Sequence, residues 1–222
     1  VFHLAAISDL RADEDLIYST NFIGSKNVFD AAKQAGAKII FTSSSAVYGE
    51  TKLAKESDEC HPANQYGKSK LRAEKICPGG FIARLFNVYG PEGHGAVNIF
   101  CKLIPKYEDV NVFGHGTQTR DFIYVDDVVN ALIMGMKMEG VYNIGTGKEM
   151  SLLEVIDMIH AMTKAKPNIK FTAPLAGDVQ RSRADISKIQ QTEWFPRVEL
   201  NDGIRKVLMT EGFDFSVIES LK

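Results

Sequence analysis

The apolar positions of the chain form short continuous runs separated by longer stripes of helical spacing. The apolar runs at residues 1–6, 38–42 and 81–85 predict three buried strands. Over residues 14–35 apolar residues recur every three or four positions, which predicts a helix, and a second helix is expected over residues 64–75. Strands that alternate with helices of this length predict βαβ units, and therefore an α/β fold with a doubly wound parallel sheet.

The chain changes character after Gly90. Residues 90–95 form a glycine-rich loop, and the less regular mixture of short elements that follows predicts a second, smaller lobe. A strand, a helix and a further strand are expected within residues 121–144. Ser151 and Glu154 then match a capping box, which predicts that a helix begins there.

Composition and charge remove several classes of protein. The 26 Lys and Arg against 28 Asp and Glu give a net charge of −2, without a basic run, so no nucleic acid partner is expected. No apolar segment approaches the roughly 18 to 20 residues of a membrane span, so no membrane partner is expected. The cysteines lack C-x-x-C spacing and the histidines lack paired spacing, so neither a disulfide framework nor a metal site is expected. This cysteine usage indicates a reducing compartment, and we expect a cytoplasmic protein.

A tyrosine and a lysine stand four residues apart in the second predicted helix, at Tyr66 and Lys70. On a helix this spacing puts both side chains on one face. A nearby ammonium favours the phenolate, which lowers the pKa of a tyrosine toward that of a general base. The pattern also arises by chance, since Tyr48 and Lys52 show it in a predicted loop. An isolated match is more often a surface pair, so the spacing alone leaves both interpretations open.

Two further segments suit a ligand. Residues 43–45 are three serines at the carboxyl end of a predicted strand, where parallel sheets bind ligands, and their hydroxyls either contact a substrate oxygen or cap the turn. The sequence Gly145-Thr146-Gly147-Lys148 follows a strand and precedes a helix, as phosphate-binding loops do. Met150 stands where such a loop needs a third glycine, so a plain turn is favoured.

Several segments together resemble the extended short-chain dehydrogenase/reductases. They are, in chain order, VFHLAA at residues 1–6, Asn21 within YSTNFIG, TSSSAVYG at 42–49, YGKSK at 66–70, RLFNVYGP at 84–91 and TRDFIYVDD at 119–127. Within these enzymes the nearest likeness is to the NAD-dependent nucleotide-sugar epimerases and dehydratases of the UDP-glucose 4-epimerase type. The motifs follow one another in the family's order and cover nearly the whole chain.

The resemblance implies a partial Rossmann-like fold. The family's G-x-x-G-x-x-G fingerprint, which binds the cofactor pyrophosphate after the first strand, is absent from the sequence. Because Val1 opens directly on a strand-like run, we expect a fragment whose first βαβ units, roughly 60 residues, lie upstream. Residues 1–90 would then be the C-terminal half of the NAD-binding domain, to which residues 120–150 return. Residues 91–119 and 151–222 would form the smaller α/β substrate-binding lobe.

The resemblance also assigns site residues. It implies catalytic roles for Ser44, Tyr66 and Lys70, and contacts with the cofactor NAD for Ala5, Ala6, Asn21, Ser43, Tyr66, Lys70 and Phe86. It places a nucleotide-diphosphate sugar on Ser44, Asn87, Asn98, Phe113, Arg120 and Asp178. In this scheme the Phe113 ring stacks on the base and Arg120 binds the diphosphate. Taken alone, Arg120 would otherwise form a surface pair with Asp121 or Asp126.

One position departs from the family's pattern. The family carries a further arginine near the diphosphate, where this chain has Leu175. That contact is therefore either lost or supplied by Arg181 or Arg183.

The reaction implied is epimerisation at C4 of a sugar of the UDP-glucose and UDP-galactose type. Tyr66 removes the proton of the C4 hydroxyl while hydride passes to NAD, and the 4-keto sugar then takes the hydride back on its other face. Dehydratases carry an Asp-Glu pair where this chain has Ser45 and Ala46, which disfavours dehydration. Reduction of a 4-keto sugar, decarboxylation and a non-catalytic NAD or nucleotide-sugar binding protein stay open. Family members pair through two helices per subunit, so we expect a homodimer through residues 14–35 and 64–75.

Overall fold

The computed structural model describes residues 1–216, and its centre is a parallel sheet of four strands. The strand order is β1-β2-β3-β8, with β1 (Phe2–His3), β2 (Ile40–Ser44), β3 (Phe81–Leu85) and β8 (Gly140–Ile144). All three pairings are parallel. All of β2 and nearly all of β3 are buried, as expected for strands covered on both faces. The predicted parallel α/β fold is confirmed.

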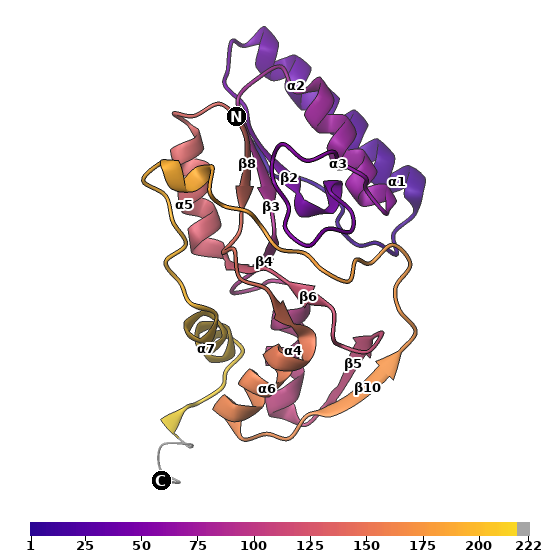
Figure 1. Cartoon of the computed structure of the whole chain (residues 1–222), viewed down its shortest axis with the longest axis vertical. Helices are drawn as coiled ribbons and strands as arrows, with labels where there is room; N and C mark the ends of the chain where they lie inside the picture. The colour runs from indigo at the N-terminus through magenta and orange to yellow at the C-terminus, as the bar shows by residue number, and fades with distance from the viewer. Residues whose placement is uncertain (217–222) are drawn as a thin grey trace.

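Helices cover both faces of this sheet (Figure 1). On one face lie α1 (Glu14–Tyr18), the π-helical segment η1 (Ser19–Ile23), α2 (Gly24–Gln34) and α3 (Gln65–Ile76). The other face carries α5 (Val125–Gly135). The single helix expected over residues 14–35 is therefore interrupted by a π-helical turn. No helix within residues 1–216 is long and apolar enough to span a membrane.

A second group of elements lies below the sheet in Figure 1. It contains α4 (Ala96–Leu103), the short helix η3 (Ile104–Lys106), β5 (Asp109–Phe113), α6 (Leu152–Thr163), β10 (Asn168–Thr172) and α7 (Leu200–Thr210). Strands β5 and β10 pair in parallel. The capping box at the start of α6 is present as predicted, because Ser151 and Glu154 bond to each other's backbone amides.

Short strand pairs connect the two groups. These are β4 (Asn87–Tyr89) with β7 (Phe122–Tyr124), and β6 (Thr119–Arg120) with β9 (Met150–Ser151). The remaining short helices are η2 (Ser45–Val47) and η4 (Ile189–Gln191). The first strand expected within residues 121–144 is β7, which ends at Tyr124 because Val125 already begins α5.

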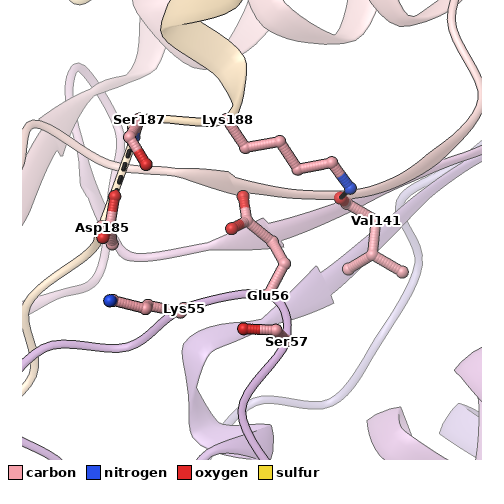
Figure 2. Close-up of a pocket in the computed structure, with 7 residues that line it drawn as sticks. All are labelled: Lys55, Glu56, Ser57, Val141, Asp185, Ser187 and Lys188. Atoms are coloured by element: carbon pink, nitrogen blue, oxygen red, sulfur yellow. Dashed lines mark hydrogen bonds between the residues drawn. The ribbon is translucent and has the colours of Figure 1, made fainter.

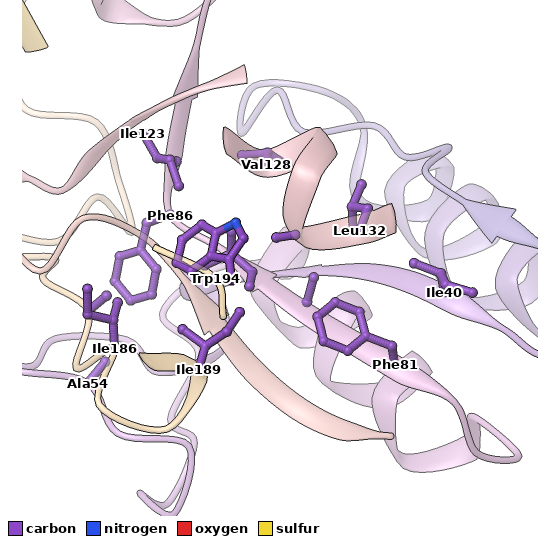
Figure 3. Close-up of a cluster of buried hydrophobic side chains, with 14 of the residues drawn as sticks. Ile40, Ala54, Phe81, Phe86, Ile123, Val128, Leu132, Ile186, Ile189 and Trp194 are labelled. Atoms are coloured by element: carbon purple, nitrogen blue, oxygen red, sulfur yellow. The ribbon is translucent and has the colours of Figure 1, made fainter. Parts of the chain in front are cut away.

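Each group has its own apolar core. The core of the sheet includes Ile40, Phe81, Phe86, Ile123, Val128, Leu132, Ile186, Ile189 and Trp194 (Figure 3). The second core joins α4, α6 and α7 through residues such as Phe100, Ile156 and Leu208. Trp194 and its neighbours were expected in the second lobe, over residues 151–222, but they pack on the sheet. The chain therefore returns to the first core before α7, and residues 217–222 of the expected lobe lie outside the described residues.

Side chains close the outer edge of β8. The backbone amide of Asn143 donates to the Glu56 carboxylate at 2.8 Å, and the Lys188 ammonium donates to the Val141 carbonyl at 2.7 Å. Glu56, Val141 and Lys188 border a hollow of about 490 Å³, in which Figure 2 shows Lys188 reaching Val141. An open strand edge invites pairing with another chain, and charged side chains prevent it. The hollow is therefore explained by the protection of a sheet edge.

Candidate active site

A cleft of about 1050 Å³ lies between the two groups, at the carboxyl ends of β2 and β3. This is the edge at which parallel sheets bind ligands. Of the residues that the sequence assigned to the site, the cleft contains Ala6, Ser43, Ser44, Tyr66, Lys70, Phe86, Asn87, Phe113, Arg120 and Asp178. The structure thus brings together the candidate catalytic trio and most of the candidate substrate residues, although they come from distant parts of the chain.

Ser44 and Tyr66 meet at the end of β2. Ser44 caps the helix η2, since its hydroxyl accepts a hydrogen bond from the Ala46 amide at 3.1 Å. Burial raises the pKa of Tyr66, and a hydrogen bond with the Ser44 side chain lowers it. The approach depends on Gly67, because a Cβ there would stand 2.4 Å from the Ala46 carbonyl oxygen. The serine therefore caps a turn and also contacts the candidate base.

Lys70 lies one helical turn after Tyr66 and is 2 % exposed. Its ammonium donates to the Thr42 carbonyl at 2.8 Å and stands 4.9 Å from the centre of the Phe41 ring. Burial lowers the pKa of Lys70 to about 8, although the charge of Glu74 raises it. Burial and Ser44 are the influences on the Tyr66 pKa. The spacing predicted that Lys70 lowers this pKa directly, and the structure does not show that effect.

The second match to the tyrosine–lysine pattern is structural. Tyr48 is 3 % exposed, and its hydroxyl donates to Oδ1 of Asn143 at 2.6 Å. Burial raises the pKa of Tyr48 to about 12, and the nearby Arg84 opposes that shift. Tyr48 is absent from the cleft. Of the two tyrosines, only Tyr66 is placed to exchange a proton with a ligand there.

Three of the expected contact residues, Ala5, Asn21 and Asn98, do not line the cleft. Ala5 is exposed elsewhere on the surface, whereas Asn21 and Asn98 are buried. Asn21, in the π-helical segment, accepts from the Ile7 amide at 2.8 Å and donates to the Ile7 carbonyl at 2.9 Å. It therefore holds the loop after β1. Asn98 donates to the Gly90 carbonyl, and its Oδ1 is buried without a hydrogen-bond partner.

The loop that follows β1 lies in the site, although none of its residues after Ala6 was predicted there. Ile7, Ser8, Asp9, Leu10 and Arg11 all border the cleft. Asp9 and Arg11 form an exposed ion pair at 3.0 Å. The signal was available, because the carboxyl-end rule applied to the first strand points to the residues after Ala6.

Arg120 pairs with another candidate substrate residue. Its guanidinium donates to Asp178 at 2.5 Å and to the Thr119 carbonyl at 2.7 Å. The surface pair with Asp121 or Asp126, considered as the alternative, is therefore wrong. Both members of the pair border the cleft, where a guanidinium suits an anion and a carboxylate suits a hydroxyl.

The turn after β8 is a plain turn, as the sequence favoured. The buried carboxylate of Asp121 accepts from the amides of Thr146 at 2.7 Å and Gly147 at 2.9 Å. Burial raises the pKa of Asp121, and these hydrogen bonds oppose the shift. Amides that already bind a carboxylate do not offer a phosphate site.

Neither arginine proposed to replace the missing family arginine borders the cleft. The Arg181 guanidinium pairs with Glu149, and Arg183 donates to the Gly147 carbonyl at 2.8 Å. Leu175 itself borders the cleft. Neither of the two arginines expected to replace it is therefore placed to contact a ligand in the cleft.

A parallel sheet with a serine, a tyrosine and a lysine at its carboxyl edge defines a dehydrogenase/reductase-like enzyme, and comparison with known proteins identifies the family. Residues 1–145 match the model of the NAD dependent epimerase/dehydratase family. The chain belongs to this family of enzymes, and within it resembles the nucleotide-sugar enzymes of the extended short-chain dehydrogenase/reductase class.

Individual relatives carry different activities in their names. A putative UDP-glucose 4-epimerase of Methanocaldococcus jannaschii is 35% identical over 94% of this chain and 75% of its own length. UDP-glucuronic acid decarboxylase 1 of Danio rerio is 30% identical over 85% of this chain, which spans half of that protein. The solved structure of MoeE5 in complex with UDP-glucuronic acid and NAD is 30% identical, with a TM-score of 0.90, and the match covers 95% of this chain and 78% of MoeE5.

The residues present fit the nicotinamide end of NAD. Lys70 has three ammonium donors, of which one bonds to the Thr42 carbonyl. The buried donors that remain suit ribose hydroxyls, and the Tyr66 hydroxyl lies on the same helix face. Ala6 leaves room beside them, and Phe86 supplies an apolar wall. Asn21 holds the β1 loop that forms the other side of this space.

Proposed function

We propose that the protein catalyses NAD-dependent epimerisation at C4 of a UDP-sugar of the glucose and galactose type. The observation that carries the proposal is the convergence of Ser44, Tyr66 and Lys70 in one cleft with Phe113 and Arg120. The first group suits proton transfer at a sugar hydroxyl. The second suits a base and a diphosphate. The similarity to the M. jannaschii protein supports the choice of reaction.

The residues have separate roles in this reaction. Tyr66 takes the proton of the C4 hydroxyl, and Ser44, which is bonded to Tyr66, orients that hydroxyl. The ammonium of Lys70 stabilises the negative charge that forms on Tyr66 and holds a ribose hydroxyl. Lys70 and Tyr66 would hold the nicotinamide end of NAD, which would supply the hydride acceptor and donor for the sugar carbon. Proton transfer by a positioned side chain contributes about 10²- to 10⁴-fold to a rate.

Decarboxylation of a UDP-uronic acid is the second candidate function. It is favoured by the similarity to the D. rerio decarboxylase and to MoeE5, which was solved with UDP-glucuronic acid. The residues next to Ser44 do not favour dehydration, because Ser45 and Ala46 provide no acid there.

A substrate panel distinguishes these reactions. The full-length protein is incubated with NAD and, separately, with UDP-glucose, UDP-galactose and UDP-glucuronic acid, and the products are separated by chromatography. We expect interconversion of the two neutral sugars. A UDP-pentose and carbon dioxide from UDP-glucuronic acid would establish the decarboxylase instead. If NAD binds but none of the three UDP-sugars is converted, the protein is a non-catalytic binding protein and the proposed reaction is wrong.

Arg120 tests whether the ligand is a nucleotide diphosphate. Replacing it (Arg120→Ala) is expected to weaken UDP binding by about 1.5 to 3 kcal/mol, the scale of a charge-assisted hydrogen bond, without changing NAD binding. Isothermal titration of UDP into both proteins measures this. The matched control is Arg181→Ala, whose guanidinium pairs with Glu149 outside the cleft and should leave UDP affinity unchanged. Equal affinities for Arg120→Ala and wild type would contradict the assignment.

The homodimer and the cytoplasmic location are part of the same proposal. Leu16 of α1, Ile23 of η1 and Ile76 of α3 are 50%, 39% and 40% exposed. Exposed apolar side chains mark a contact surface where they form one patch, and we propose that these helices provide it. All the cysteines are free, as suits a reducing compartment. Leu16→Glu is expected to shift the protein toward a monomer in analytical ultracentrifugation. The control Val129→Glu, on α5, should not, and an unchanged dimer in Leu16→Glu would remove this face.

A further inference from the structure

Helix α3 is bonded to strand β2 at three successive points along the helix. Residues 42–44 of the strand meet Tyr66, Lys70 and Glu74, which are spaced four residues apart. Lys70 donates to the Thr42 carbonyl at 2.8 Å, the Ser43 hydroxyl donates to the Glu74 carboxylate, and Ser44 bonds to Tyr66. The first two helix residues border the cleft, whereas Glu74 does not.

Glu74 also bonds to the next strand. The Arg84 guanidinium, on β3, donates to both carboxylate oxygens of Glu74, at 3.0 and 2.7 Å. The two side chains are 6% and 7% exposed. Replacing a buried ion pair by well-packed apolar residues of similar volume is often neutral or stabilising, so an apolar contact would hold a helix on a sheet at least as well. Stability alone therefore does not account for an ion pair at this point.

The environment of the Lys70 ammonium gives the pair a second consequence. Around it stand the Phe41 ring from β2, His3 from β1 and Glu74 from its own helix, and Tyr66 lies one helical turn before it. Burial lowers the pKa of His3, and the charge of Lys70 lowers it further. An imidazole carries no negative charge, so His3 does not compensate the charge of Lys70. The carboxylate of Glu74 is the group that opposes the effect of burial on Lys70. Arg84 pairs with that carboxylate, and Cys60 and Cys77 also lie within the electrostatic range of Glu74.

We propose that Glu74 is a positioning residue for the Tyr66 and Lys70 pair, since it fixes α3 to β2 and β3 and supplies the negative charge that keeps Lys70 protonated in a buried site. This role rests on the proposed function, in which Lys70 must carry a positive charge beside Tyr66. Glu74 acts through Lys70 and touches neither the sugar nor the cofactor.

The test measures the ionisation of Lys70 directly. Lysine labelled with ¹³C at the ε position is introduced into the full-length protein, and the Lys70 signal is identified by its loss in Lys70→Met. In Glu74→Gln the titration midpoint of Lys70 is expected to fall by about 1 pH unit or more, the scale for loss of a nearby opposite charge. The alkaline limb of the kcat profile should move to lower pH in the same variant.

A matched control and a second variant complete the design. Glu199→Gln removes the same charge from an exposed ion pair with Lys148 and should leave the Lys70 midpoint in place. If Glu74→Gln does not fold, the double variant with Arg84→Met removes the unpaired buried charge, and the Lys70 midpoint should again fall. A folded variant in which the Lys70 midpoint is unchanged would overturn the proposal. Because this measurement needs no turnover, a protein that fails on every sugar but shows the shift would refute the proposed function alone.

Discussion

Two helices pack on opposite faces of the same sheet, and their buried surfaces differ in chemistry (Figure 1). Helix α5 buries Val128, Ala131 and Leu132 in the apolar core shown in Figure 3. The helix comes so close that a Cβ at Gly135 would stand 2.4 Å from the Phe81 ring. This face has the dense apolar packing that contributes most of a protein's stability.

Helix α3 instead buries Ser69, Lys70 and the carboxylate of Glu74. Its apolar contribution to the sheet is mainly Ala73, within a smaller cluster that includes Phe41. Burying an ammonium and an ion pair costs stability. The face covered by α5 therefore contributes mainly to stability. On the other face, α3 holds charged side chains in place for chemistry, and their burial lowers the stability of the fold.

The largest expected effect is a loss of turnover in a variant of α3. Tyr66→Phe should lower turnover at least about 100-fold, the low end of general acid–base contributions, with little change in NAD binding. Steady-state kinetics and a cofactor titration measure the two. Tyr48→Phe is the matched control, because it loses the bond to Asn143 but should retain turnover. Near-normal turnover in Tyr66→Phe would remove the base assignment.

The next effect belongs to the α5 face. Leu132→Ala deletes a side chain that is 7% exposed in the sheet core and should lower the free energy of unfolding by about 2 to 4 kcal/mol. Urea denaturation measures this change. The neighbouring Ile133 is 56% exposed, so Ile133→Ala should cost far less. Equal losses in the two variants would mean that α5 does not pack as described.

The smallest expected effect is an increase in the free energy of unfolding, on the α3 face. Burial lowers the pKa of Lys70 to about 8, below the ordinary value of 10.5, so the unfolded chain binds this proton more tightly than the folded chain. The full cost of burying the charge is present below pH 8 and disappears as the pH rises toward 10.5. Lys70→Met should therefore raise the free energy of unfolding by roughly 1 to 3 kcal/mol at pH 7 while abolishing activity.

Urea denaturation of Lys70→Met and wild type at pH 7 and pH 10 checks both the sign and the pH dependence. The gain in stability should shrink at the higher pH. If Lys70→Met is less stable than wild type at pH 7, or if the two proteins differ in stability by the same amount at both pH values, then burial of the Lys70 charge does not destabilise the fold.

Much of the fold could be predicted from local pattern. The strand over residues 81–85 has the predicted bounds, and the helix of Tyr66 and Lys70 starts one residue later than expected, with Asn64 as its cap. The capping box at Ser151 is present. These features depend on residues close together in the chain, where spacing and hydrogen bonding to the neighbouring backbone decide the structure.

The sequence by itself therefore determined the parallel α/β fold, the order of its elements and the placement of Ser44 and Tyr66 near the carboxyl edge of the sheet. Only the tertiary structure decided that Tyr48 is structural, that Trp194 returns to the sheet core, and that Arg120 pairs with Asp178. It also decided that Glu74 joins α3 to two strands. Each of these depends on contacts between residues far apart in the chain, and burial at such contacts changes the energy of a charge or a ring in a way that local spacing does not encode.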